Sequence, residues 1–142
     1  MVAPGSAHLT LRCDLDEVAR ADAWLQGFCS GHGVVEDALY DLRLCLDEVL
    51  ANVIRHGYGV GDTGTVHVLI ECPGDRVRLE VRDAAARFNP LDAADPDLDV
   101  APEDRPIGGL GIFLVRQLMD MVSYDYENGE NRLSMERSLR RR

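Results

Sequence analysis

The stretch from Leu39 to Tyr58, LYDLRLCLDEVLANVIRHGY, places apolar residues at the three-and-four spacing of a helix that packs against a core. Polar residues capable of chemistry stand among these apolar positions. The stretch therefore predicts a helix that both builds the core and contributes to a functional site. Its apolar positions are Leu39, Leu42, Cys45, Leu46, Val49, Leu50, Val53 and Ile54.

Glu48, Asn52 and His56 follow one another at intervals of four residues. Since each helical residue turns by roughly 100°, they are predicted to form one polar stripe. A Glu can accept a proton, an Asn carbonyl oxygen can bind Mg²⁺, and a His can donate to an anion. These are the groups that a phosphoryl-transfer site uses. An ordinary solvated helix face with i,i+4 contacts would show the same pattern.

The length and the charge of the chain limit the classes of protein to which it can belong. A chain of 142 residues with 46% hydrophobic residues predicts one globular domain. No apolar run reaches the roughly 18 residues of a membrane span, and the N-terminal residues lack a signal-sequence pattern, so a cytoplasmic location with no membrane contact is expected. The net charge of −10 disfavours a nucleic-acid partner, despite the short basic tail Arg140–Arg142.

The residue types exclude several mechanisms. All 15 basic residues are Arg, which removes the P-loop, the strand lysine of protein kinases and Schiff-base chemistry. The four cysteines form no C-x-x-C pair and are predicted to be buried thiols. The four histidines are too scattered to suggest a zinc site.

The remaining patterns predict a two-layer α/β sandwich with a mixed, mostly antiparallel sheet covered on one face by helices. A helix with Val18, Ala19, Leu25 and Phe28 on its apolar face is expected to end at Gly31 and Gly33. A later helix is expected to run to Val122. The strands are predicted over His8 to Asp14, Thr65 to Cys72, Arg76 to Asp83, Tyr124 to Glu127 and Arg132 to Leu139, the last two joined at Asn128-Gly129.

Two segments lie between these elements. Ala84 to Ile107 is rich in proline and acidic residues and has no period, which is typical of a functional lid or of a disordered segment. Gly108-Gly109-Leu110-Gly111 then opens a helix, where free backbone N–H groups can meet a phosphate. A plain hinge into the helix explains the glycines equally well.

Three blocks occur in one order: EVLANVIRHGY (Glu48 to Tyr58), VRDAAARFNP (Val81 to Pro90) and GGLGIFLVRQLMDMVSY (Gly108 to Tyr124). Together they resemble the GHKL ATPase superfamily, and most closely the stand-alone anti-sigma factor serine kinases of bacteria. The likeness extends from His8 to Leu139. It implies the Bergerat α/β sandwich as a single histidine-kinase-like ATPase domain over residues 1–142. The ordered core would cover about 8–139 and a mobile ATP lid about 84–107.

The resemblance also implies roles for individual residues, with ATP and Mg²⁺ as cofactors. Glu48 would be the general base, Asn52 the Mg²⁺ ligand, and Asp83 the acceptor for the adenine amino group. Asn131 would support the adenine end, and Arg55 and His56 would lie near the phosphates. The glycine box around the phosphates would consist of Gly108, Gly109, Leu110, Gly111 and Ile112.

One position departs from the family pattern. The family has a D-x-G motif whose Asp corresponds to Asp83, at the end of the strand predicted over Arg76 to Asp83. This chain has Ala85 in place of the glycine. Its methyl group could crowd the base or stiffen a turn that requires positive φ. The departure bears directly on nucleotide affinity.

Three functions compete at this stage. The first is a serine/threonine kinase that binds a sigma factor and phosphorylates a STAS-domain anti-anti-sigma protein. The second, motivated by Ala85, is a module that sequesters a sigma factor or STAS protein without kinase activity. The third is the catalytic domain of a sensor histidine kinase, for which the chain has no room for a phosphoacceptor domain. By analogy, a homodimer could form through the N-terminal strand and the first helix.

Overall fold

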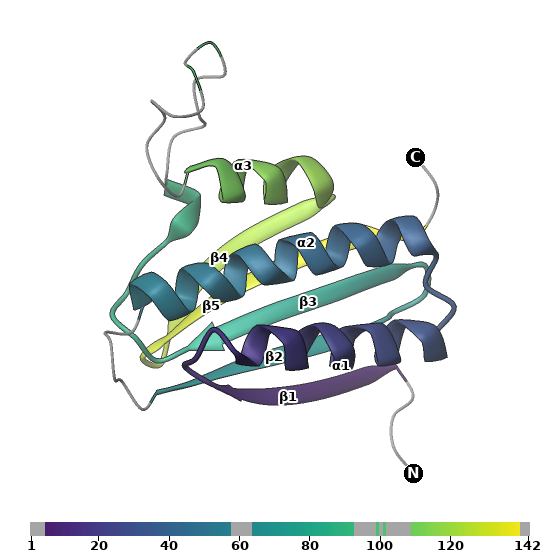
Figure 1. Cartoon of the computed structure of the whole chain (residues 1–142), viewed down its shortest axis with the longest axis horizontal. Helices are drawn as coiled ribbons and strands as arrows, with labels where there is room; N and C mark the ends of the chain where they lie inside the picture. The colour runs from purple at the N-terminus through teal and green to yellow at the C-terminus, as the bar shows by residue number, and fades with distance from the viewer. Residues whose placement is uncertain (1–4, 58–63, 93–98, 100, 102–108, 140–142) are drawn as a thin grey trace.

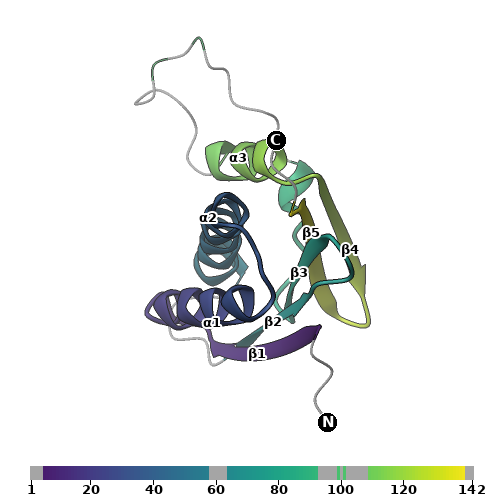
Figure 2. The ribbon, with the colours of Figure 1, turned by 90° about the vertical axis from the view of Figure 1, so that its right-hand side faces the viewer.

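A five-stranded sheet lies beneath three α-helices, which all cover the same face (Figures 1 and 2). The computed structural model describes residues 5–57, 64–92, 99, 101 and 109–139. The α/β sandwich predicted from the sequence is confirmed. In chain order the elements are β1 (Ser6–Arg12), α1 (Glu17–Gly31), α2 (Glu36–Asn52), β2 (Thr65–Glu71), β3 (Arg76–Asp83), α3 (Gly109–Leu118), β4 (Met121–Glu127) and β5 (Glu130–Ser138).

The strand order is β1-β2-β3-β5-β4, and all four neighbouring pairs are antiparallel. The sequence had predicted a mixed sheet, and this prediction is wrong, because the described strands form a purely antiparallel sheet. A parallel pair would form if β4, which follows the α3 crossover, lay beside β3. Instead β4 takes the outer edge, and β5 returns through a tight turn to lie between β3 and β4. Asn128 and Gly129 in that turn have φ of +54° and +79°, as a two-residue hairpin turn requires.

Helix α2 lies at the centre of the helical layer and packs against both α1 and α3. Five of the eight predicted apolar positions are buried, whereas Leu39, Val53 and Ile54 are only partly buried. The buried ones are Leu42, Cys45, Leu46, Val49 and Leu50. They face the inner side chains of the sheet, which alternate with exposed ones along each strand. On α1 the buried face runs through Ala21, Leu25 and Cys29 rather than through Ala19, which is exposed.

Several predicted boundaries differ from the structure, two of them at helix ends. Helix α2 begins at Glu36, before Leu39. The last helix ends at Leu118 rather than at Val122, because the chain turns at Asp120 and β4 begins at Met121. The Asp120 N–H donates to the Glu136 carbonyl, which ties this turn to β5. The prediction extended the helix too far because the apolar residues Met121 and Val122 happen to continue its spacing.

Helix α2 opens into a π-helix over Val53–Gly57, directly after Asn52. A π-turn has i→i+5 hydrogen bonds, so residues four apart no longer align along it. Glu48 and Asn52 share a face of α2, and the third residue of the predicted stripe, His56, falls in the π-helix. The side chain of His56 and all of Tyr58 lie outside the described residues.

The four cysteines are thiols that form no disulfide. Cys29 and Cys45 are buried as predicted, and burial raises the pKa of Cys29 to about 11 and that of Cys45 to about 12. Cys13 and Cys72 are only partly buried. Within the described ranges, no group of three or more His, Cys, Asp or Glu residues could hold a metal ion. No described helix has both the length and the apolar character to cross a membrane.

Two carboxyl groups meet where α1 packs on α2. Asp47 lies beside Asp22, and burial together with that neighbour raises the pKa of Asp47 from 3.8 to about 7. The Oδ1 atoms of both residues are buried without a hydrogen-bond partner among the described groups. Arg43 lies 3.9 Å from Asp22 and offsets only part of the repulsion. This contact therefore favours the protonated form of Asp47.

Because the folded state binds this proton more tightly than the unfolded chain, the free energy of unfolding should fall as pH rises from about 4 to about 7. Asp47→Asn keeps a hydrogen-bond donor toward Asp22 and removes the titration. We expect this variant to match the original protein in urea unfolding at pH 5 and to exceed it at pH 8. Asp125→Asn, at an exposed position on β4, is the control. An unchanged loss of stability between the two pH values in Asp47→Asn would contradict the assignment.

Candidate functional site

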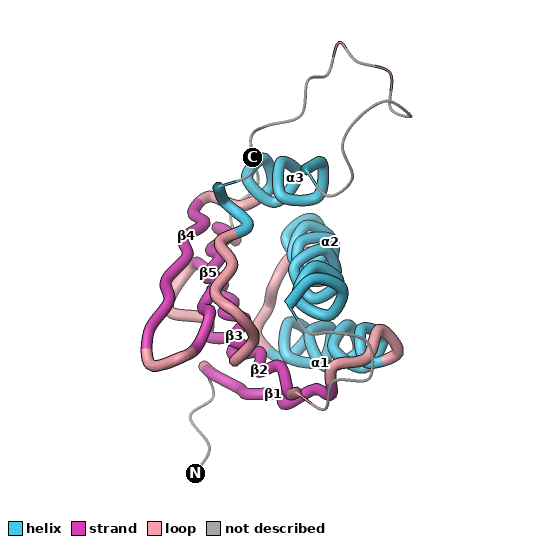
Figure 3. The backbone as a smooth tube through the Cα atoms, turned by 90° about the vertical axis from the view of Figure 1, so that its left-hand side faces the viewer, coloured by secondary structure: helices cyan, strands magenta, loops and turns pink. Residues whose placement is uncertain are grey.

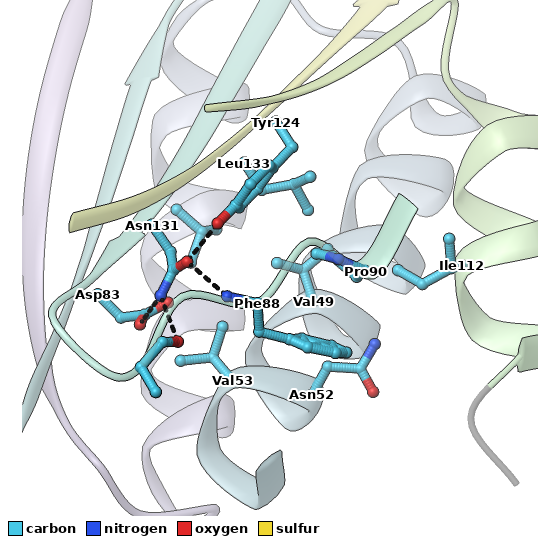
Figure 4. Close-up of a pocket in the computed structure, with 12 residues that line it drawn as sticks. Val49, Asn52, Val53, Asp83, Phe88, Pro90, Ile112, Tyr124, Asn131 and Leu133 are labelled. Carbon is cyan, nitrogen blue, oxygen red and sulfur yellow. Dashed lines mark hydrogen bonds between the residues drawn. The ribbon is translucent and has the colours of Figure 1, made fainter. Parts of the chain in front are cut away.

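A pocket opens between α2, the first turn of α3 and the ends of β3 and β5 (Figure 4). It contains about 470 Å³ of empty space, its open mouth included. Its wall is mostly apolar, and its few polar groups gather at one end and at the mouth. The lining residues are Val49, Asn52, Val53, Val81, Asp83, Ala86, Phe88, Pro90, Ile112, Tyr124, Asn131 and Leu133.

Asp83 and Asn131 form the polar end of the pocket. They are cross-strand partners on β3 and β5, and both are 6% exposed. Asn131 Nδ2 donates to Asp83 Oδ1 at 2.9 Å, and the Ala85 N–H donates to the same oxygen at 3.0 Å. No described group donates to the second oxygen of Asp83. The pocket therefore retains one buried carboxylate acceptor for a ligand.

The pKa of Asp83 is raised above its usual range, because burial outweighs the hydrogen bonds to its carboxylate. Burial raises its pKa, while the hydrogen bonds from Asn131 and from the Ala85 N–H lower it. Such bonds stabilise the charged carboxylate in a site with little water. An ionised acid here suits a ligand that offers an N–H donor.

After β3 the chain runs as a loop to a short helical turn near α3 (Figure 3). Asn131 Nδ2 also reaches the carbonyl oxygens of Ala85 at 3.2 Å and Ala86 at 3.1 Å, and Asn131 Oδ1 accepts the Phe88 N–H at 3.0 Å. The segment ends in a 3-10 turn over Pro90–Asp92, beside α3. Arg116 of α3 donates there to the Leu91 carbonyl.

Residues 84–89, at the start of the predicted lid, form no helix or strand, as the sequence predicted. Hydrogen bonds from Asn131 nevertheless hold this part of the chain against the pocket. Residues 93–98, 100 and 102–108 lie outside the described residues. A mobile lid over that part stays a prediction.

Glu48 lies against the first turn of α3. A Cβ built on Gly111 would stand 2.1 Å from Glu48 Oε2 and 3.0 Å from the Glu48 carboxyl carbon. Only a glycine allows this approach between α2 and α3. The fold thus brings together Glu48 and the glycine segment, which are more than 60 residues apart in the sequence.

The other predicted site residues are placed less completely. Ile112 is buried and lines the pocket, Gly109 begins α3, and Arg55 is exposed in the π-turn. Gly108 lies outside the described residues, as do the side chains of Leu110 and His56.

Comparison with known proteins identifies the architecture. The sequence model of the histidine kinase-like ATPase domain matches residues 11–137. The chain belongs to this family. Serine/threonine-protein kinase BtrW of Bordetella bronchiseptica is 31% identical over 96 residues, which are 68% of each chain. Serine-protein kinase RsbW of Halalkalibacterium halodurans is 28% identical over 131 residues, covering 89% of this chain and 79% of the relative.

RsbW of Listeria monocytogenes serotype 4a is 30% identical over 112 residues, covering 74% of this chain and 69% of the relative. A crystal structure of the RsbU and RsbW domains of Rv1364c from Mycobacterium tuberculosis matches with a TM-score of 0.68 at 17% identity. The match covers 94% of this chain and 32% of that chain, and it supports the fold. The resemblance to the anti-sigma factor serine kinases is confirmed. The relatives are named as protein kinases.

In this histidine kinase-like ATPase domain, the Ala85 departure is accommodated. Ala85 is 8% exposed and its side chain belongs to the hydrophobic core, whereas Ala86 lines the pocket. Among the described non-glycine residues only Asn128 has positive φ, so Ala85 is not strained. The strained turn expected from the methyl group is therefore absent, and the methyl group packs in the core rather than in the pocket lining.

Ala85→Gly should therefore lower the free energy of unfolding by about 1 kcal/mol, since it loses a buried methyl group and adds chain entropy. The Kd for Mg-ATP should change by less than about twofold, because Ala85 is not part of the pocket lining. Urea unfolding and calorimetric titration measure both quantities. Ala84→Gly, at an exposed neighbouring position, is the matched control. Much tighter nucleotide binding by Ala85→Gly would contradict this account.

Several lining residues were not predicted as site residues. Val49, Val53 and Leu133 had been assigned to the core by their spacing, and they line the pocket from the core side. Tyr124 carried no signal beyond its place at the end of the third sequence block. Phe88 is 49% exposed and lies next to Asn52 at the mouth (Figure 4).

Proposed function

We propose that the protein is an anti-sigma factor serine/threonine kinase that binds Mg-ATP and phosphorylates a STAS-domain anti-anti-sigma protein. The contact of Glu48 with Gly111 carries the proposal, because it puts a carboxylate beside the helix start that would hold the phosphates. The comparisons support the kinase class and the ATP-binding fold.

The pocket has two chemically different ends that suit a nucleotide. Asp83 and Asn131 would receive the adenine, with the free Asp83 oxygen accepting its amino group. Val49, Ile112 and Leu133 would contact the ring faces. The N-terminus of α3, with its unpaired N–H groups and positive end, would bind the phosphates.

The residues at the mouth fit Mg²⁺. Asn52 lies one helical turn beyond Glu48 and lines the pocket, and its amide oxygen is the hard ligand that Mg²⁺ prefers. Asn52 would hold the ion together with phosphate oxygens. When bound, Mg²⁺ would offset the negative charge of the phosphates during transfer.

Glu48 would act as the general base in this proposal. A substrate serine must lose its hydroxyl proton as it attacks phosphorus, and a carboxylate within reach can accept that proton. Glu48 is neither fully buried nor fully exposed, so a substrate hydroxyl can approach it. Gly111 leaves the space that the carboxylate occupies.

Partner switching supplies the biological role in this proposal. The protein would bind a sigma factor in one state and a STAS-domain protein in another, in the cytoplasm and without contact to nucleic acid or membrane. A homodimer is also proposed, and the position of β1 at an edge of the sheet supports contacts there.

The test combines binding with transfer. Calorimetric titration of ATP with Mg²⁺ and with EDTA should show Mg²⁺-dependent binding, and incubation with labelled ATP and candidate STAS proteins should give acid-stable phosphoserine. Glu48→Gln is the matched inactive control. Acid-labile phosphohistidine would instead support a sensor-kinase catalytic domain. If the protein binds a partner tightly but binds no nucleotide, the result would support the sequestering module. If it binds neither a nucleotide nor a partner, the proposal is overturned.

A further inference from the structure

Tyr124 of β4 is hydrogen bonded to the polar end of the pocket. Its hydroxyl donates to Asn131 Oδ1, which also accepts the Phe88 N–H. Asn131 Nδ2 faces only acceptors, namely Asp83 Oδ1 and two backbone carbonyls. These partners allow one orientation of the amide, because the reverse would set the amide oxygen against a carboxylate. Tyr124 and Phe88 together therefore fix Asn131.

This arrangement leaves the lining of the polar end with an acceptor and no free donor among its described groups. Both hydrogens of Asn131 and the Phe88 N–H are already used. The Tyr124 hydroxyl hydrogen is used as well, and its oxygen faces the Arg87 side chain, which lies outside the pocket lining. What remains for a ligand is the second oxygen of Asp83.

We propose that Tyr124 is a positioning residue that sets the choice of purine. Its hydroxyl holds Asn131 in the orientation that keeps an Asp83 oxygen free for an exocyclic amino group. A 6-oxopurine would place a carbonyl oxygen against this acceptor and would be rejected, because the polar groups on both sides would be left unpaired. The inference rests on the proposed nucleotide function and adds a residue to its base-recognition end.

Tyr124→Phe removes one hydroxyl and keeps the ring. Loss of the hydrogen bond frees Asn131 to rotate, so the Kd for ATP should rise about fivefold. The Kd for purine riboside triphosphate, which lacks the 6-amino group, should change by less than about twofold. The Kd for ITP should stay the same or fall, so that the preference for ATP over ITP narrows. Tyr126→Phe is the matched control, since Tyr126 is two residues along the same strand and outside the pocket lining.

A second readout needs no nucleotide. The side-chain amide hydrogens of Asn131 should exchange slowly with solvent in the original protein and in Tyr126→Phe, as followed by NMR. They should exchange several-fold faster in Tyr124→Phe. This measurement reports the positioning itself and is independent of whether the protein binds ATP.

The outcomes separate the two proposals. A narrowed preference for ATP over ITP, with faster Asn131 exchange, supports the role of Tyr124. Equal weakening of all three nucleotides, or unchanged exchange, overturns it and leaves the kinase proposal standing. If the original protein binds no nucleotide, the kinase proposal fails and the purine choice fails with it, while faster exchange would still show that Tyr124 orients Asn131.

Discussion

Glu48→Gln is expected to lower the rate of phosphate transfer to serine by roughly 10³-fold, the effect of losing a general base. The amide has the size of the carboxylate but cannot accept the proton of the substrate hydroxyl. The Kd for ATP should change by less than about twofold, because Glu48 is absent from the pocket lining. Single-turnover transfer of labelled phosphate and calorimetric titration measure the two effects.

A second variant moves the same carboxylate instead of removing it. In Gly111→Ala the new methyl group would stand 2.1 Å from Glu48 Oε2, so the flexible end of Glu48 must shift. Transfer should fall by roughly 10²-fold, with the melting temperature little changed because Ala favours a helix by about 1 kcal/mol over Gly. Gly27→Ala on α1 is the control, since nothing lies within 4 Å of its added Cβ. Full activity in Gly111→Ala would show that the position of Glu48 against α3 has no catalytic role.

Asn131→Ala should lower the free energy of unfolding by about 3 kcal/mol, since it leaves several buried polar groups without partners. These groups include the Asp83 carboxylate and the Phe88 N–H. ATP binding should weaken by roughly 100-fold, because the segment after β3 and the orientation of Asp83 depend on this side chain. Urea unfolding and calorimetry provide the two measurements.

Asn89→Ala serves as its control. Asn89 also accepts a backbone N–H, from Leu91, but its other hydrogen bond is exposed and it does not line the pocket. Its replacement should cost about 1 kcal/mol or less. If Asn131→Ala kept both its stability and its ATP affinity, Asn131 would not hold the pocket together.

The helix at the centre of the fold could be predicted because its own residues carry the signal. The apolar spacing from Leu42 to Leu50 requires a buried face, and Glu48 and Asn52 stand on the side that remains. The strands β2 and β3 were predicted for the same reason, since each alternates buried and exposed residues. Local periodicity is sufficient when an element buries one face.

The missed features depend on contacts between distant parts of the chain. The place of β5 between β3 and β4 follows from pairing across the sheet, and no local pattern shows it. Tyr124 gains its role only because β4 lies beside β5, opposite Leu133 and near Asn131. The π-helix after Asn52 could not be predicted from the sequence either, because its apolar residues continue the spacing of the α-helix. Ala85 was misjudged because a family pattern gives a residue type without its φ angle or its surroundings.

The pairing of Asp83 with Asn131 has a consequence for how the protein folds. These residues are 48 positions apart and meet only when β5 has docked on β3 in the correct register. Loops of this length close at an entropic cost, so such contacts form after local helices and hairpins. A shift of β5 by one residue would bring Glu130 or Arg132 opposite Asp83. The side chain of Asn131 would then point to the other face of the sheet. The ligand pocket is thus a late product of folding, and ligand binding during refolding would report when the sheet has found its register.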